Sequence, residues 1–240
     1  WAIEIIIPWL DWENSELASM SWQSYLWYPR LHKSFLLQIK EYLLNTAKHY
    51  EALGELNKQY AQFITYVSLQ NYKELKSSEL VSVFNDLPTL ALVHVASTLN
   101  DGISGSGEKY REYWEHRVKP FLRKVWPKNV EVSDMTVNQL ALLCISTKNH
   151  FEEAFEILKH SLREYDDTEY LIRQLNNADI ISLFPRLSLD FMNRVISEPR
   201  FRPPSKLSEC LTKVIRLEPE LERSQEYRRL ITIVRQYENE

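Results

Sequence analysis

Three of the chain's four glycines stand close together, in the segment Gly102-Ile-Ser-Gly105-Ser-Gly107. Gly102 and Gly107 have the spacing of a phosphate-binding loop, in which a lysine directly follows the last glycine. Here Glu108 occupies that position, and Lys109 comes one residue late. A phosphate cradle also needs a strand before the loop, and no strand is predicted there. We therefore expect a flexible linker over 102–107, not a nucleotide site.

Histidines and cysteines give no metal site at the spacing that zinc ligands use in sequence. None of the six histidines has another His or a Cys three or four residues away. His150-Phe-Glu152 is similar to the start of a zinc deaminase motif, but no Pro-Cys-x-x-Cys follows it. Cys144 and Cys210 lie in apolar helical patterns, where cysteine behaves as a small hydrophobic residue. We predict no metal, no cofactor and no catalytic residue, although a hydrolase site assembled only by the fold remains an alternative.

Two clusters of basic residues are the remaining candidates for binding. The first comprises His116, Arg117, Lys119, Arg123, Lys124 and Lys128, and the second comprises Arg194, Arg200, Arg202 and Lys206. Such clusters are most often solvated faces, and their functional interpretation is an anionic partner, either protein or nucleic acid. The net charge of −4 argues against a dedicated nucleic-acid-binding protein, which usually has a basic excess.

The elements that carry these residues are predicted to be helices. Apolar residues recur at spacings of three and four, as in Leu36, Ile39 and Leu43 or in Val137, Leu140 and Cys144. Over 15–27, Met20, Trp22, Leu26 and Trp27 are predicted to cluster near one side of a helix. Pro120 is expected to kink or split a helix over 108–126. The segments 149–152 and 166–169 have the capping-box spacing and predict helix starts.

Glycine is too scarce for a protein built on hairpins, since hairpin turns depend on positive φ. The chain is therefore predicted to be all-α, an irregular helical array of roughly a dozen helices, similar to HEAT or armadillo solenoids but without a fixed repeat. We expect two helical halves, 1–101 and 108–240, joined by the glycine-rich segment 102–107.

The first residues are unusually apolar, and the chain does not begin with Met. A chain terminus is normally polar and frayed. We therefore expect residues 1–12 to continue from a preceding domain and to pack both on the helix at 15–27 and on that domain. The interdomain contact is assigned to Ile3, Ile6, Ile7, Trp9 and Trp12.

Several tryptophan-rich stretches resemble a known family. They are Trp22-Gln-Ser-Tyr-Leu-Trp-Tyr-Pro-Arg-Leu31, His49-Tyr-Glu-Ala-Leu-Gly54, Tyr113-Trp-Glu-His-Arg-Val-Lys-Pro-Phe121 and Val125-Trp-Pro-Lys128. They resemble the C-terminal helical region of very large bacterial anti-phage defence proteins, some of which have an N-terminal sirtuin-like domain while others are STAND-like. The resemblance implies no catalytic residue here, and it implies an effector domain upstream, an NADase or NTPase.

The functional prediction is accordingly a non-catalytic sensor or scaffold that binds a protein partner and regulates an upstream effector. The expected partners are upstream domains of the same chain, a phage protein or a second copy. The alternative is a nucleic-acid-binding accessory domain that uses the basic clusters. No apolar run approaches the roughly 18 residues that span a membrane, and we expect a cytoplasmic protein.

Overall fold

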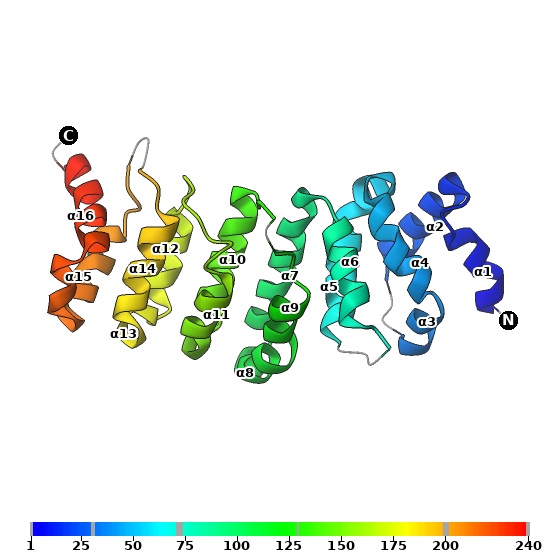
Figure 1. The fold of residues 1–240 in the computed structure, drawn as a ribbon, viewed down its shortest axis with the longest axis horizontal. Helices are drawn as coiled ribbons and strands as arrows, with labels where there is room; N and C mark the ends of the chain where they lie inside the picture. Colours follow the sequence, from blue (N-terminus) through cyan, green and yellow to red (C-terminus); the bar gives the residue numbers. More distant parts are fainter. Residues whose placement is uncertain (1, 30–31, 71–73, 129, 199–201, 239–240) are drawn as a thin grey trace. The chain divides into compact units, whose positions relative to one another are not determined.

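All regular elements in the described part of the chain are helices (Figure 1). The computed structural model describes residues 2–29, 32–70, 74–128, 130–198 and 202–238. Outside the helices, an isolated parallel bridge joins Tyr165 to Ile196. The prediction of an all-α, irregular helical array is thus confirmed.

The chain divides into two compact units that interleave along the sequence. The first unit comprises Trp1–Leu99 and Glu112–Ser133, and the second comprises Asn100–Arg111 and Asp134–Glu240. The predicted halves, 1–101 and 108–240, differ from these units because the segment from Glu112 packs with earlier helices. Phe121, for example, makes an edge-on contact with Phe84, with ring centroids 4.9 Å apart.

The elements of the first unit are mostly short. They are α1 (Ala2–Leu10), α2 (Ser15–Trp27), α3 (Lys33–Gln38), α4 (Lys40–Asn45), η1 (Thr46–Leu56), α5 (Asn57–Leu69), α6 (Ser77–Asp86), η2 (Thr89–Ala91), the π-helical turn η4 (Trp114–Val118) and α9 (Lys119–Lys124). Two helices, α7 (Leu92–Gly105) and α8 (Tyr110–Tyr113), begin in one unit and end in the other.

Large aromatic side chains form the core of the first unit, and their polar atoms bond to the ends of neighbouring helices. The buried Trp22 donates from Nε1 to the carbonyl oxygen of Leu10, 3.0 Å away at the end of α1. The buried Tyr60 donates its hydroxyl to the carbonyl oxygen of Leu43, at 2.8 Å. Each bond gives the polar atom of a buried aromatic side chain a partner, so burial and hydrogen bonding favour the same arrangement.

Pro120 divides its helix, as predicted, through a π-helical turn. A proline has no N–H, and in an α-helix its ring would collide with the carbonyl four residues earlier, which is that of His116. In the structure, Lys119 donates its N–H to Trp114, five residues back. Widening the turn in this way relieves the clash while the backbone stays helical from Tyr110 to Lys124.

The predicted glycine linker at 102–107 is wrong. Helix α7 continues through Gly102 to Gly105, and only Gly107 has a positive φ, of 55°. The buried stripe of α7 includes Leu99 and Ile103, so it extends into the glycine-rich segment. Burial of an isoleucine side chain contributes about 1.5–3 kcal/mol, which exceeds the cost of about 1 kcal/mol for a helical glycine.

Successive helices pack on one another in the second unit (Figure 1). Its elements are η3 (Gly107–Lys109), α10 (Asp134–Ser146), η5 (Lys148–His150), α11 (Phe151–Leu158), α12 (Glu169–Asn177), α13 (Ile180–Leu183), α14 (Pro185–Val195), α15 (Leu207–Leu217), η6 (Pro219–Arg223) and α16 (Gln225–Glu238). Helix α10 contacts α11 and α12, and α14 contacts α15 and α16. Contacts between sequence neighbours are characteristic of helical arrays.

Arg229 on α16 links the end of α14 to α16 through hydrogen bonds. Its guanidinium donates to the carbonyl oxygens of Asn193 and Ile196, at 2.9 and 2.7 Å, and to the carboxylate of Glu164 at 2.6 Å. Arginine suits this position because its planar group presents several donors in a fixed geometry. Three parts of the second unit are thereby held by one side chain.

No single described helix is both long and apolar enough to cross a membrane; only α6 taken together with Thr89–Gly105, a pair bent by 111°, passes that test.

Candidate partner-binding surface

An open apolar groove lies on the first unit, between α1, α2 and the start of α3. Its volume is about 500 Å³. The lining residues are Ile6, Trp9, Leu10, Leu17, Met20, Ser21, Ser24, Tyr25 and Phe35. We call this surface the α1–α2 groove.

Helix α2 forms the groove because it is apolar on two faces. One stripe, Ala18, Trp22 and Leu26, is buried in the core of the unit. On another stripe Met20 is 63% exposed, and Trp27, seven residues further on, is 62% exposed. A helix that only covers a core has a polar outer face, but Glu16 is the single charged residue of α2. Exposed apolar side chains grouped in this way mark interaction surfaces.

The α2 side of the groove combines two serines with one aromatic ring. The Ser24 hydroxyl donates to the carbonyl oxygen of Met20, at 2.8 Å, so it is satisfied within its own helix. Tyr25 makes edge-on contacts with Trp22 and Phe63, at 5.9 and 5.6 Å, and burial raises its pKa to about 12. The tyrosine is therefore neutral at physiological pH, and this part of the lining contributes apolar contacts.

The residues predicted to contact another domain fall into three groups. Ile6 and Trp9 line the groove, and Trp9 is 48% exposed. Ile7 is half-buried, and the side chain of Ile3 lies outside the described residues. Trp12 is only 7% exposed, because it packs inside the first unit against His49, so its assignment to an interdomain contact is wrong.

The predicted packing of Met20, Trp22, Leu26 and Trp27 on one side is also wrong. Trp22 and Leu26 are buried, whereas Met20 and Trp27 face outward. These four residues do not share one narrow stripe, because 100° separates successive residues of a helix. The near absence of charge from α2 was the sequence signal for a second apolar face.

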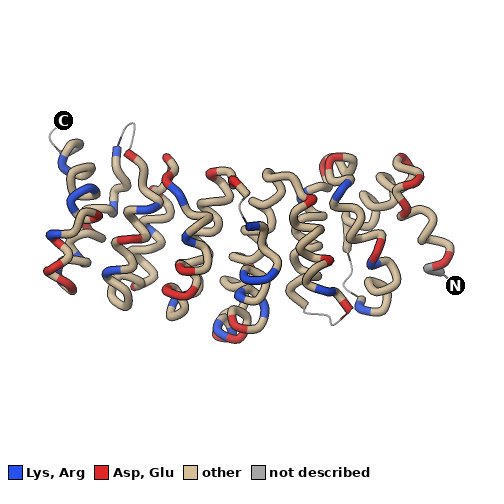
Figure 2. The backbone as a smooth tube through the Cα atoms, in the orientation of Figure 1, with Lys and Arg blue, Asp and Glu red and all other residues tan. Residues whose placement is uncertain are grey.

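The first basic cluster lies on η4, α9 and the segment that follows (Figure 2). Arg117 donates to the carbonyl oxygen of Leu69 and to Oε1 of Gln70, which fixes the end of α5. Lys119 pairs with Glu115 at 2.8 Å. Lys124 and Lys128 are exposed, as are His116 and Arg123. Arg117 thus helps to hold the first unit together.

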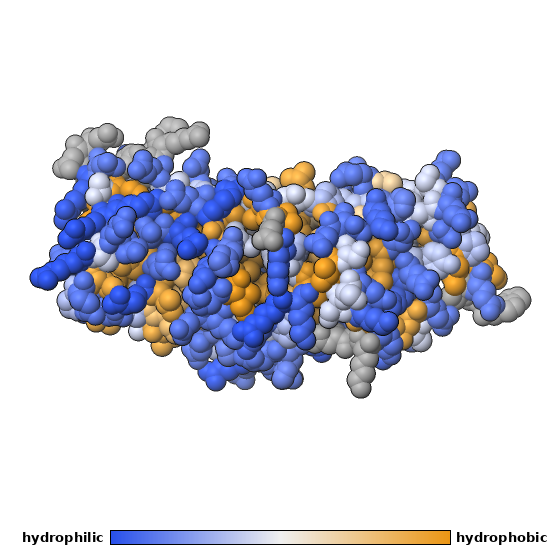
Figure 3. Space-filling view, in the orientation of Figure 1, coloured by the Kyte–Doolittle hydropathy of each residue, from blue (hydrophilic) through white to orange (hydrophobic). Residues whose placement is uncertain are grey.

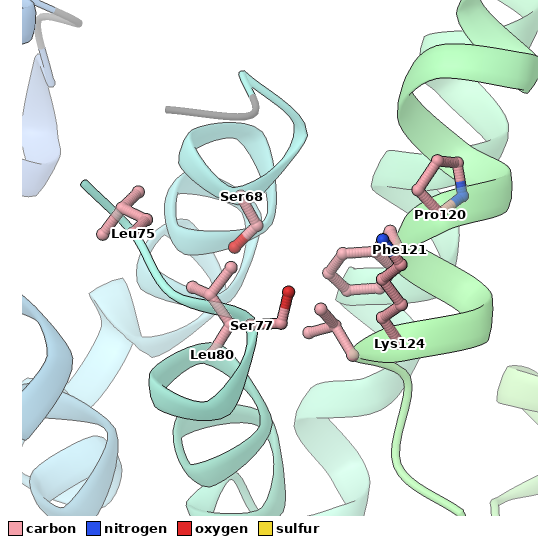
Figure 4. Close-up of a pocket in the computed structure, with 8 residues that line it drawn as sticks. Ser68, Leu75, Ser77, Leu80, Pro120, Phe121 and Lys124 are labelled. Carbon is pink, nitrogen blue, oxygen red and sulfur yellow. The ribbon is translucent and has the colours of Figure 1, made fainter. Parts of the chain in front are cut away.

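A small cavity of about 90 Å³ lies beside this cluster, between α5, α6 and α9 (Figure 4). Leu75, Leu80 and Phe121 form its apolar part, and Lys124 lies at its lining. The hydroxyl of Ser68 donates to the carbonyl oxygen of Ile64, at 2.7 Å. This serine is already bonded in its own helix and has no histidine or carboxylate in the cavity lining to act as its base.

The second basic cluster does not form a positive patch in the described part of the chain. Arg202 lines a cavity of about 130 Å³ together with Asp166, Asp167 and Glu169. Lys206 pairs with Glu209 at 2.8 Å. Arg194 donates to the carbonyl oxygen of Lys159, at 3.1 Å, and Arg200 lies outside the described residues. Arg202, which the sequence grouped with other cations, thus shares a cavity lining with three carboxylates.

The surface of the first unit near α1 shows apolar side chains among hydrophilic ones (Figure 3). The groove therefore offers recognition by apolar contact. No known protein family, curated protein or solved structure matches this chain.

Proposed function

We propose that this chain is a helical protein-binding module that docks a protein partner in the α1–α2 groove. The observation that carries the proposal is the exposure of Met20 and Trp9 in the lining of a groove of about 500 Å³. Leaving large apolar side chains in water is costly, at about 25 cal/mol for each Å² of apolar surface. A partner that covers them recovers this free energy, and tryptophan and methionine are enriched in such interfaces.

The lining of the groove favours a protein over a polar small molecule. Pockets for metabolites usually have a few polar groups that converge on the ligand. Here the polar side chains in the lining are Ser21, Ser24 and Tyr25, and Ser24 is bonded within its own helix. Apolar side chains of a partner match the remaining lining.

The resemblance described above supports a setting for this module. If the chain belongs to a large bacterial anti-phage defence protein, the groove is the place where a partner would be sensed in the cytoplasm, and an upstream NADase or NTPase effector would be regulated by its occupancy. The support is the set of tryptophan-rich stretches, of which Trp22–Leu31 includes part of the groove. Enzymatic activity is assigned in this proposal to domains outside the chain.

Site-specific photo-crosslinking in bacteria tests the proposal. A photoreactive amino acid is placed at Met20 in one strain and at Met135 in another. Met135 is a matched control, because it is also a helical methionine and is 61% exposed, but it lies on α10 in the second unit. We expect a discrete adduct at Met20 and none at Met135, in cells expressing the protein in which the chain occurs.

Infected and uninfected cultures provide the two arms for the defence setting. An adduct at Met20 that changes on phage infection supports a sensor, and one that is unchanged supports a scaffold. If Met20 gives no adduct in either arm, or the same adducts as Met135, the proposed protein-binding function of the groove is wrong.

A further inference from the structure

The α1–α2 groove is bounded by two helical stripes. On α1 the lining residues Ile6, Trp9 and Leu10 are spaced at i, i+3 and i+4. On α2 the lining residues Leu17, Met20, Ser21 and Ser24 are spaced at i, i+3, i+4 and i+7. Two packed helices with ridges on both sides of a depression offer the shape into which the ridge of a third helix fits.

Small side chains also line the groove. Ser21 and Ser24 stand between the larger Met20 and Tyr25 along α2. Since the Ser24 hydroxyl is bonded to the Met20 carbonyl, it adds little demand for a polar partner. A row of apolar side chains on one face of a helix fits this profile, as in complexes where a helix lies in a groove with anchors at i, i+3, i+4 and i+7.

The charged residues around the groove determine which charges a partner helix can carry beside its apolar row. Residues 1–29 contain Glu4, Asp11, Glu13 and Glu16 and no lysine or arginine. Figure 2 accordingly shows α1 and α2 without blue segments. Glu16 lies in the first turn of α2, four residues before Met20, and therefore beside the groove.

The lysines on the adjoining elements α3 and η1 are accompanied by carboxylates. Lys33, at the start of α3, pairs with Glu74 at 3.0 Å. On η1, which packs against α2, Lys48 is accompanied by Glu51 and Glu55. Carboxylates thus outnumber lysines on α1, α2 and η1, and a partner complementary to this acidic excess presents positive charge.

The described surface of the second unit argues against that unit of a second copy as the occupant, and the acidic excess around the groove argues against pairing of two such grooves. On the last helix Leu230, Ile233 and Val234 are buried within the second unit, and Ile231 is half-buried. The remaining exposed large apolar residues of that unit, Met135, Tyr170, Leu183 and Leu217, lie on four different helices. No described surface of the second unit thus provides an apolar stripe with basic flanks.

We infer that the occupant of the α1–α2 groove is an amphipathic helix of a different protein, with an apolar stripe flanked by lysine or arginine. The inference rests on the proposed function and narrows its partner class. Apolar contact supplies the affinity of this complex, and the acidic residues select the orientation and sequence of the bound helix.

Selection from a displayed peptide library measures this chemistry directly. The library presents helical peptides of about four turns, roughly 15 residues. Their apolar stripe is fixed, and their flanking positions are randomised among basic, acidic and neutral residues. We expect the 240-residue chain to enrich lysine and arginine at the flanks, and Met20→Gln to lose the enrichment while Met135→Gln retains it.

Charge reversal then tests the role of Glu16 on a synthetic peptide with lysine flanks. Glu16→Lys is expected to weaken binding roughly 3- to 10-fold, the range for one exposed ion pair lost and replaced by repulsion. The matched control is Glu152→Lys, which changes the net charge equally and also replaces an acidic residue in the first turn of a helix. Circular dichroism establishes that both variants are folded.

The outcomes separate this inference from the function on which it rests. The inference that the bound helix has basic flanks is wrong if the library enriches acidic or neutral flanks, or if Glu16→Lys and Glu152→Lys bind the lysine-flanked peptide equally. Met20 adducts would in either case still support a protein-binding groove. Sedimentation velocity measures self-association of the chain. If the chain self-associates and Met20→Gln does not, a second copy occupies the groove, and the inference is wrong. Absence of Met20 adducts in cells removes the function itself.

Discussion

The indole of Trp12 stacks on the imidazole of His49, with ring centroids 4.4 Å apart and planes inclined by 7°. Its Nε1 also donates to the Thr46 hydroxyl, at 2.9 Å. Trp12 lies in the segment between α1 and α2, whereas His49 and Thr46 belong to η1. This contact joins the chain's first residues to the core of the first unit, and so it holds α1 where the groove requires it.

Replacing Trp12 is therefore expected to destabilise the first unit in two steps. Trp12→Phe keeps most of the apolar contact and loses the hydrogen bond, at about 1 kcal/mol. Trp12→Ala also leaves a cavity, at about 3–5 kcal/mol. Urea titration followed by circular dichroism measures both, and Trp27→Ala is the control because its side chain is largely exposed. Equal losses for Trp12→Ala and Trp27→Ala would contradict the assignment of Trp12 to the core.

Arg117 is expected to behave as a structural residue and Lys124 as a surface residue. Arg117→Ala removes charge-assisted bonds to Leu69 and Gln70 and is expected to cost about 1.5–3 kcal/mol. Lys124→Ala, from the same predicted cluster, is expected to change the unfolding free energy by less than about 0.5 kcal/mol. Thermal and urea unfolding compare the two variants. A larger effect of Lys124→Ala would show that the cluster is organised differently.

The nucleic-acid alternative is tested with Lys124 and Lys128, two exposed lysines of the first basic cluster. DNA and RNA oligonucleotides are titrated against the chain at about 50 mM salt, where phosphate contacts are strongest. We expect no saturable binding. Binding that weakens steeply with salt and disappears on combined Lys124→Glu and Lys128→Glu substitution would favour the nucleic-acid function over the proposed one.

Two glycine substitutions are expected to have opposite effects. Gly54 has φ 57° and ψ −126°, a conformation almost restricted to glycine, so Gly54→Ala is expected to cost about 1–3 kcal/mol. Gly105 is helical, and a Cβ built there meets no atom within 4 Å, so Gly105→Ala is expected to stabilise by up to about 1 kcal/mol. Denaturant midpoints measure both. Destabilisation by Gly105→Ala would contradict the helical end of α7.

Glu169 is expected to make stability depend on pH. Hydrogen bonds from the hydroxyl and N–H of Ser205, at 2.6 and 2.7 Å, hold the pKa of its carboxyl below the ordinary value of 4.5. A depressed folded-state pKa contributes stability above the unfolded pKa, and this is lost as pH falls through the folded value. The stability difference between wild type and Glu169→Gln should therefore shrink below about pH 4.5. A constant difference for Glu169→Gln across this pH range would refute the linkage.

Local signals were sufficient for the helical fold. Glycine scarcity and apolar spacing of three and four predicted an all-α array, because an amphipathic helix repeats its apolar residues with the period of the helix. Helix starts near 151 and 169 were found where capping boxes were predicted. The predicted caps differ from the observed ones: neither N-cap, His150 or Thr168, makes a side-chain capping hydrogen bond, and Glu169 bonds Ser205 instead.

What the sequence by itself determined was the existence and period of the helices, together with the apolar excess of residues 1–27. Tertiary structure decided which apolar residues are buried: it placed Trp12 in the core, left Met20 and Trp27 outside, and used Arg117 to fix the end of α5. The physical reason is that burial depends on what packs against a face, and residues distant in sequence supply that packing. A pattern within one helix records that a face is apolar, but it does not record whether this chain or a partner covers it.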